Sequence, residues 1–144
     1  MGFEISDQVR ALNAQLQHFM DEHIYPRERE WHEWCHDPEH LWEVPAWYDD
    51  IRDKAKAEGL WNLFLPEEYA PWSPGLTNVE IAPLFETMSK VMWAQGVFNC
   101  NAPDRGNMEV LAKYGTSEQQ EQWLKPLLAG EIRSAYAMTE PQVA

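Results

Sequence analysis

The chain has 144 residues and a formal net charge of −13, with 44% hydrophobic and 24% charged residues. This length suits one folded domain, and the composition is typical of a soluble globular protein. The acidic balance argues against a basic nucleic-acid-binding surface and against electrostatic docking on anionic lipid. No apolar run approaches the roughly 18–20 residues that a membrane-spanning helix needs. The acidic stretch from Met1 to Asp21 is also unlike a secretory signal.

Apolar residues spaced by three and four predict a first helix, with Ser6 as its N-cap. Its expected inner face is Ile5, Val9, Leu12, Leu16, Phe19 and His23. We expect Pro26 to kink or end this helix near Tyr25. Residues 27–43 are polar and aromatic, and only part of them is expected to be helical. His32, His36 and His40 have the spacing of zinc ligands on a helix, but Pro38 breaks the register. We therefore favour a solvated segment and predict no metal site.

A second helix is expected between Pro45 and Gly59. Its buried face would be Trp47, Tyr48, Ile51 and Ala55. The apolar run 59–66 ends in a proline and is expected to be an extended core loop, followed by a surface loop over residues 67–76.

Thr77 and Glu80 form a capping box that opens a third helix, which Pro83 is expected to distort. Its predicted inward residues are Ile81, Leu84, Phe85 and Met88. A fourth helix is predicted over residues 104–114, with Met108, Leu111 and Ala112 as its apolar face. A second capping box at residues 117–120 opens a fifth helix, closed by Gly130, with Trp123, Leu124, Leu127 and Leu128 inward. Residues 134–139 lack a helical pattern, and a strand there would need partners.

The sequence carries few motifs with an independent chemical meaning. The nucleophile pattern GxSxG, the phosphate loop GxxxxGK[ST] and the dinucleotide pattern GxGxxG are all absent. The numerous carboxylates are interpreted as solvating groups. Cys35 and Cys100 lie far apart, which is typical of two free thiols in a reduced chain. The polar, glycine- and proline-bearing stretch 98–111 is either the lining of a pocket or an ordinary connection between helices.

Four ordered blocks resemble the N-terminal domain of the acyl-CoA dehydrogenase family. They are the loop 59–66, the stretch 97–111, the pair Tyr114-Gly115 with residues 120–130, and Met138-Thr139-Glu140-Pro141. The resemblance covers nearly the whole chain and is looser before residue 45. It looks closest to the branch that in animals is fused to a phosphotransferase-like kinase domain.

The resemblance implies an all-α, orthogonal bundle of five to six helices over residues 1–134. Residues 135–144 would then be an extended segment that begins a β-domain. It also implies FAD as cofactor, an acyl-CoA substrate, α,β-desaturation, an electron-transfer flavoprotein as electron acceptor, and a homo-oligomer. The implied location is the cytoplasm in a bacterium, or the mitochondrion or peroxisome in a eukaryote.

The site residues follow from the same resemblance. Tyr136, Met138 and Thr139 match family positions that contact the flavin ring. The residues that match the floor of the acyl cavity are Asn99, Cys100, Asn101, Asp104 and Met108. The family's catalytic glutamate and second flavin-flanking segment have no counterpart in the 144 residues. No catalytic residue is therefore assigned among them, and Glu80, Glu86, Glu109 and Glu131 are not candidates.

Two functions remain open from sequence. One is an N-terminal portion of an FAD-dependent acyl-CoA dehydrogenase that is inactive by itself. The alternative is a non-catalytic helical domain that serves as an interaction or scaffold module, in which an exposed apolar face recruits a partner.

Overall fold

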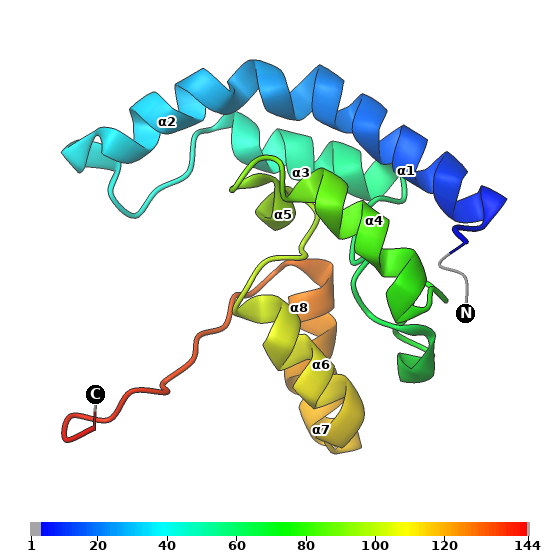
Figure 1. Ribbon diagram of the computed structural model, residues 1–144. Coiled ribbons are helices and arrows are strands. Elements are labelled where there is room, and N and C mark those ends of the chain that lie inside the picture. The colour runs from blue at the N-terminus through cyan, green and yellow to red at the C-terminus, as the bar shows by residue number, and fades with distance from the viewer. Residues whose placement is uncertain (1–3, 144) are drawn as a thin grey trace.

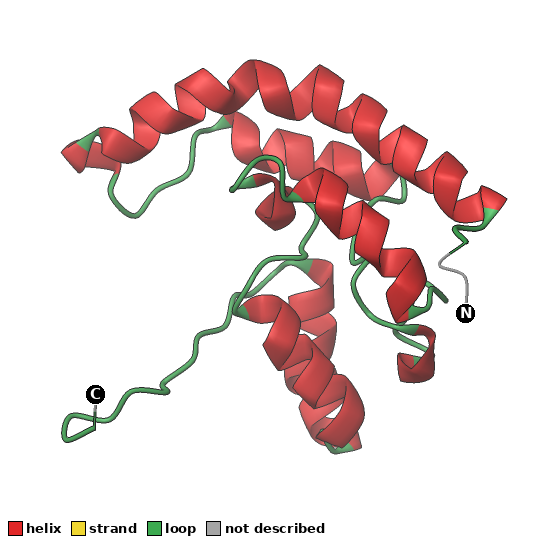
Figure 2. Cartoon of the chain, in the orientation of Figure 1, coloured by secondary structure: helices red, strands yellow, loops and turns green. Residues whose placement is uncertain are grey.

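The computed structural model describes residues 4–143, and it contains helices and loops but no strand within that range (Figure 2). Figure 1 labels α1 (Asp7–Phe19), α2 (Glu28–His36), α3 (Trp47–Ala57), α4 (Asn78–Met88), α5 (Ala94–Val97), α6 (Asp104–Tyr114), α7 (Ser117–Gln119) and α8 (Lys125–Ala129). Short 3₁₀ turns cover Pro38–His40 and Glu67–Tyr69. The predicted all-α class is confirmed. No helix within residues 4–143 is long and apolar enough to cross a membrane.

The helices form two groups (Figure 1). One group contains α1 to α5, in which α1 packs against α4 and α3 packs against α5. The other group contains α6, α7 and α8, and α6 packs against α8. The loop after α5 leads from the first group to the second, and the loop after α3 contacts the second group at Leu128. The candidate site therefore lies where these loops meet the second group.

The regular α-helical pattern is interrupted near Tyr25, in line with the prediction that Pro26 kinks or ends the first helix, but the chain stays helical beyond it. A π turn (Met20–Ile24) and a 3₁₀ turn (Tyr25–Arg27) carry the chain from α1 into α2, and together they form one long rod (Figure 1). The change of hydrogen-bond register places Pro26 in the first turn of a new helical segment. A missing N–H is tolerated at that position, so the rod continues.

Helix caps largely follow the sequence. The capping box of α4 is present, because Thr77 N donates to Glu80 Oε2 (2.9 Å) and Glu80 N donates to Thr77 Oγ1 (3.3 Å). The second box was predicted one residue too late, since the N-cap of α7 is Thr116 and its partner is Gln119. Thr116 has the extended backbone of an N-cap, whereas Ser117 is already helical.

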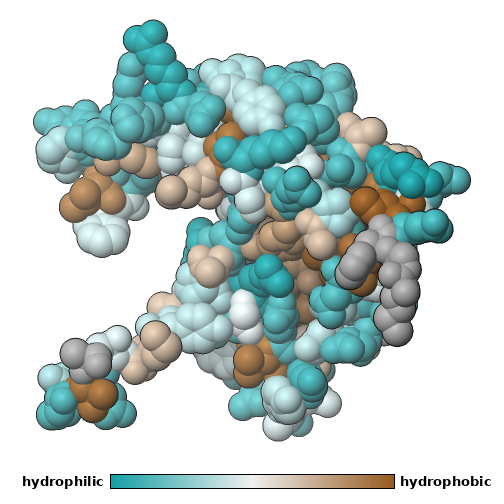
Figure 3. All heavy atoms as spheres, viewed as in Figure 1, coloured by the Kyte–Doolittle hydropathy of each residue, from teal (hydrophilic) through white to brown (hydrophobic). Residues whose placement is uncertain are grey.

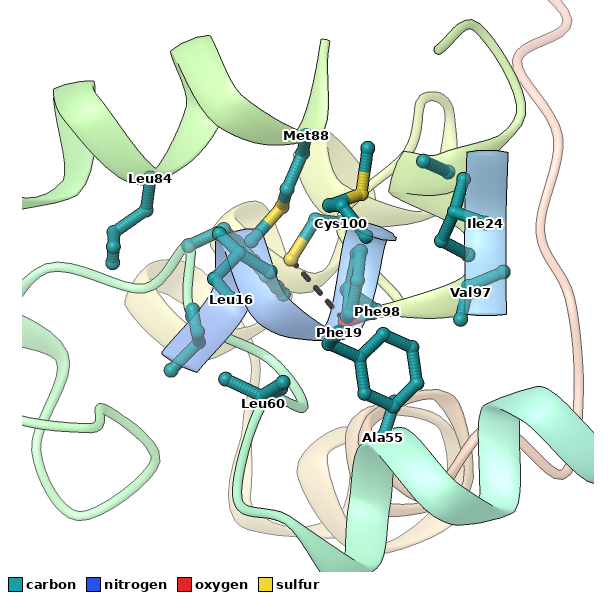
Figure 4. Packing of buried hydrophobic residues seen from close by; sticks show 14 of the residues in the cluster. Leu16, Phe19, Ile24, Ala55, Leu60, Leu84, Met88, Val97, Phe98 and Cys100 are labelled. Carbon is teal, nitrogen blue, oxygen red and sulfur yellow. Dashed lines mark hydrogen bonds between the residues drawn. The ribbon is translucent and has the colours of Figure 1, made fainter. Parts of the chain in front are cut away.

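The buried core draws on both groups of helices. Phe19 of α1 meets Phe98 edge-on, with ring centroids 5.4 Å apart, and Leu16, Met88 and Ala55 contribute to the same cluster (Figure 4). Trp123 is exposed rather than inward as predicted. The π turn Gln120–Leu124 changes the local helical period, which moves Trp123 off the stripe that Leu124 and Leu127 occupy.

Candidate functional site

The centre of the joint between the two groups is Asn99. Its side chain is only 3% exposed, and its backbone is left-handed with φ 55°. Asn99 Nδ2 donates to Asn62 Oδ1 (2.8 Å) and to the carbonyl of Leu127 (3.0 Å). Asparagine tolerates the left-handed region better than most residues. Asn99 thus joins the loop after α3 to the last turn of α8.

The loop 59–66 completes the cap of α8. Trp61 Nε1 and Asn62 Nδ2 both donate to the carbonyl of Leu128, at 2.7 and 2.8 Å. The last carbonyls of a helix lack partners within the helix, so a buried helix end requires donors of this kind. The predicted core loop is buried as expected, but its backbone turns and bends instead of being extended, and Asn62 has a left-handed backbone with φ 59°. The side chains of Trp61 and Asn62 hold the second group of helices in place.

Cys100 is buried among apolar side chains, with its Sγ directed to the carbonyl of Phe98 at 3.2 Å (Figure 4). Burial raises the pKa of this thiol to about 12. Since the thiolate is the nucleophilic form, Cys100 is inert at neutral pH. Met108 is also fully buried, and its Sδ lies 3.9 Å from Asn99 Nδ2.

Asp104 is a buried carboxylate at the start of α6, with 1% of its surface exposed. Its Oδ2 accepts from Arg133 Nε, in an ion pair whose arginine remains partly exposed. Its Oδ1 accepts from Ser134 N at 2.6 Å and from Ser134 Oγ at 2.7 Å. Asn107 Nδ2 also donates to Ser134 Oγ, at 2.8 Å. These contacts fix the chain where it leaves the helical bundle.

The residues predicted to contact flavin lie on the exposed segment beyond this point. Tyr136 is 59% exposed and Met138 is 83% exposed, and Thr139 is exposed as well. Figure 3 shows this end of the chain projecting from the body of the molecule. Ala135 to Thr139 make no backbone–backbone hydrogen bond in the described part of the chain. Ala144, the last residue of the predicted segment, lies outside the described residues, as do residues 1–3.

Tyr136 nevertheless keeps one contact with α6. A Cβ placed on Gly106 would lie 2.4 Å from the Tyr136 hydroxyl oxygen, so the glycine is what lets the ring approach the helix. An apolar groove of about 600 Å³ lies beside this contact. It is lined by Val110, Leu111, Trp123, Leu127 and Ile132 and by the segment from Arg133 to Ala135.

The structure thus separates the predicted site residues into two sets. Asn99, Cys100, Asp104 and Met108 are buried, whereas Asn101 is partly exposed and donates from Nδ2 to the carbonyl of Ala102 (3.1 Å). The flavin set, Tyr136, Met138 and Thr139, is exposed. Asp104 links the two sets, because it belongs to the first and holds the start of the segment that carries the second. Contact of these residues with a substrate or flavin stays a prediction.

The histidine-rich end of α2 was the other candidate for chemistry. His36 Nδ1 lies 2.7 Å from the carbonyl of His32, and His40 stacks on Trp34 with ring centroids 3.7 Å apart. No group of three or more His, Cys, Asp or Glu residues within residues 4–143 is arranged to hold a metal ion. A groove of about 1030 Å³ lies beside these histidines, lined mainly by Tyr25, Trp31, Val91, Met92 and Trp93.

Sequence reasoning missed Arg133, Ser134 and Asn107. The first two are about 30 residues away from Asp104 in the chain, and no local pattern connects them. The one available signal was the aspartate at the first position of a predicted helix, which is commonly read as a helix-dipole interaction.

The helical architecture and the site fit one family of proteins. The family model "Acyl-CoA dehydrogenase, N-terminal domain" matches residues 6–131. The chain belongs to the acyl-CoA dehydrogenase family.

Individual relatives agree with this assignment. The mouse acyl-CoA dehydrogenase family member 10 is 51% identical over 97% of this chain and 13% of its own length. The human acyl-CoA dehydrogenase family member 11 is 48% identical over 90% of this chain and 16% of its own. A solved Mycobacterium abscessus structure, assigned to the acyl-CoA dehydrogenases, is 47% identical with a TM-score of 0.86, over 98% of this chain and 36% of that one. The chain therefore spans about a third or less of the length of these relatives.

Proposed function

We propose that this chain is the N-terminal helical part of an FAD-dependent acyl-CoA dehydrogenase, which desaturates acyl-CoA thioesters between the α and β carbons. The observation that supports it is the match of almost the whole chain to the Mycobacterium abscessus structure in both sequence and fold. Residues 1–134 would form the helical domain and residues 135–144 the start of the next. An electron-transfer flavoprotein and a homo-oligomeric assembly are proposed partners of the whole enzyme.

The segment from Ala135 to Thr139 fits one edge of a flavin site. Its backbone N–H groups have no backbone acceptors among residues 4–143, and Thr139 adds an exposed hydroxyl donor. Donors of this kind suit the carbonyl oxygens and ring nitrogen at the pyrimidine end of a flavin. FAD, when bound, supplies the hydride acceptor for the reaction. The residues of this chain would bind and orient the ring, with Met138 as an apolar contact.

The buried loop has a different role in this proposal. Asn99 and its partners tie the loop 98–103 to α8, and a well-supported loop positions neighbouring groups accurately. In this arrangement Asn101, which is partly exposed, is the member of the predicted acyl set that is best placed to touch a ligand. Asn99, Cys100 and Met108 would then shape the floor of the acyl cavity from beneath.

A hybrid protein tests the proposal. Residues 1–143 replace the matching segment of the Mycobacterium abscessus protein, and the purified hybrid is mixed anaerobically with a series of acyl-CoA thioesters. We expect bound flavin to lose its visible absorbance with at least one thioester. A folded, flavin-loaded hybrid that no acyl-CoA reduces, while the parent protein is reduced, would contradict the proposal.

The 144-residue chain by itself is the matched control. With added FAD, an acyl-CoA series and an artificial electron acceptor, we expect no turnover, because no catalytic base is assigned within it. Turnover by this chain would refute that part of the proposal.

A further inference from the structure

The segment that carries Tyr136, Met138 and Thr139 has no secondary structure to direct it. An extended chain without partners samples many directions, and fixing one costs conformational entropy. The position of the flavin-contacting residues must therefore depend on how the chain is held just before them. A residue that positions this segment must therefore act where the chain leaves the helical bundle, at residues 133–136, which we call the exit.

Helix α6 holds that exit at three points. Asp104 binds Arg133 and Ser134, Asn107 binds Ser134, and Gly106 receives the Tyr136 ring. All three helix residues lie within the first turn of α6. The held residues span both faces of an extended chain, because side chains alternate along it. Contacts at residues 133, 134 and 136 therefore fix the direction of the chain as well as its location.

Asp104 is the member on which the others depend. A buried carboxylate is costly unless it is paired and hydrogen-bonded. Among the described residues, Asp104 finds its partners in Arg133 and the two donors of Ser134. Releasing the exit would leave this charge unpaired in the protein interior. Because release is penalised, the chain keeps one direction where it leaves the bundle, although its residues there are partly or fully exposed.

We propose that Asp104 is a positioning residue for the flavin-contacting segment: through Arg133 and Ser134 it fixes the direction in which Met138 and Thr139 are presented. The link to flavin rests on the proposed function, whereas the fixed direction of the segment does not. Asp104 touches neither flavin nor substrate in this account. It also ties the predicted acyl loop, to which it belongs, to the predicted flavin segment.

Pulsed electron–electron distance measurements test this proposal directly. Spin labels are placed at Ala137→Cys on the segment and at Glu118→Cys on α7, both exposed positions. The exposed thiol is removed by Cys35→Ser, and Cys100 remains unlabelled because it is buried and burial raises its pKa to about 12. The quantity measured is the width of the distance distribution between the two labels.

We expect Asp104→Asn to broaden this distribution about twofold and to change the melting temperature of the helices only slightly. The neutral amide keeps the size of the side chain and loses the charge that pairs with Arg133. Glu109→Gln is the matched control, since it neutralises a carboxylate of the same helix that pairs with Arg105 (3.1 Å), and it should leave the width unchanged. An unchanged width in Asp104→Asn would overturn the proposal, as would equal broadening in the control.

A second variant keeps the test decisive if Asp104→Asn does not fold. Ser134→Ala removes the hydroxyl that bridges Asp104 and Asn107 and leaves the backbone donor of residue 134 in place. It should broaden the distribution by a smaller factor, and no broadening would count against the proposal. Neither label nor readout involves FAD. A hybrid enzyme that no acyl-CoA reduces would therefore refute the proposed function alone, and an unbroadened distribution would refute the positioning role alone.

Discussion

The stretch from Phe98 to Met108, a loop and the first turn of α6, belongs to the same candidate site as the segment from Ala135 to Thr139, but the two differ in how the fold holds them. Phe98, Asn99 and Cys100 are buried, and their polar groups find partners within the chain. The segment is exposed, and within the part of the chain that the structure describes its backbone makes no backbone–backbone hydrogen bond. The polar groups of the first region are therefore satisfied by the helical fold itself. The second region is held by Asp104 at Ser134, and the backbone N–H groups of residues 135–139 face solvent.

Replacing a large buried side chain of the loop should have the largest effect. Phe98→Ala removes a fully buried ring that packs edge-on against Phe19, and we expect a loss of about 4 kcal/mol in the free energy of unfolding. Tyr136→Ala removes a mostly exposed ring and should cost less than about 1 kcal/mol. Urea denaturation of both variants measures the difference. Equal losses of unfolding free energy in the two variants would contradict the expectation that the fold depends far more on the buried loop than on the exposed segment.

The polar centre of the joint should come next. Asn99→Ala leaves Asn62 Oδ1 and the carbonyl of Leu127 without the Asn99 donor and keeps a non-glycine residue at φ 55°. We expect a loss of about 2–3 kcal/mol in the free energy of unfolding. Asn101→Ala is the matched control, because that side chain donates to the carbonyl of its neighbour Ala102 and is partly exposed. A loss in the control as large as in Asn99→Ala would show that Asn99 has no special role.

Cys100 should make stability depend on alkaline pH. Its pKa in the folded chain is raised to about 12, above its ordinary value of 9.0, by burial. The unfolded chain therefore releases this proton first, so the stabilising contribution is complete below pH 9 and is lost as the pH rises from 9 toward 12. In that window Cys100→Ala should remove a decline of about 1 kcal/mol per pH unit in the free energy of unfolding. Cys35→Ala, at an exposed thiol, should leave the slope as it is; identical slopes in both variants would contradict the prediction.

The smallest effect is expected at Thr139. Its side chain is exposed and makes no contact within the described residues that the fold requires. Thr139→Ala should therefore change the free energy of unfolding of the chain by no more than about 0.5 kcal/mol. In the hybrid enzyme the same substitution should weaken FAD binding, measured by flavin fluorescence. A variant that destabilises the chain but leaves FAD binding intact would reverse the proposed roles.

Much of the fold could be predicted because its signals are local. The bounds of α6, the capping box of Thr77 and Glu80, and the αL glycine after α8 follow from periodicity and cap chemistry. The error at Trp123 arose where a π turn altered the helical period. The shift of one residue at Thr116 has a local cause, because two hydroxyl residues competed for one N-cap.

The candidate site could be predicted less well. The resemblance led to Asp104 and Tyr136, yet it did not indicate that Arg133 and Ser134 connect them. Such a contact depends on how α6 and the end of α8 pack together, and no local sequence pattern reports packing between distant segments. The burial of Asn99 and Cys100 is likewise a property of the assembled joint rather than of the residues next to them.

The most direct test of the account is hydrogen–deuterium exchange on the 144-residue chain without any ligand. The backbone amides of Asn99 and Cys100, which donate to the carbonyls of Gly96 (3.3 Å) and Gln95 (2.8 Å), should exchange only when the helical bundle opens, whereas those of residues 135–139 should exchange far faster. The amide of Ser134, which donates to Asp104, should be protected relative to its C-terminal neighbours. Equal exchange over both regions, or an unprotected Ser134 amide in a folded chain, would contradict the claim that Asp104 anchors the exposed segment 135–139 to the helical bundle.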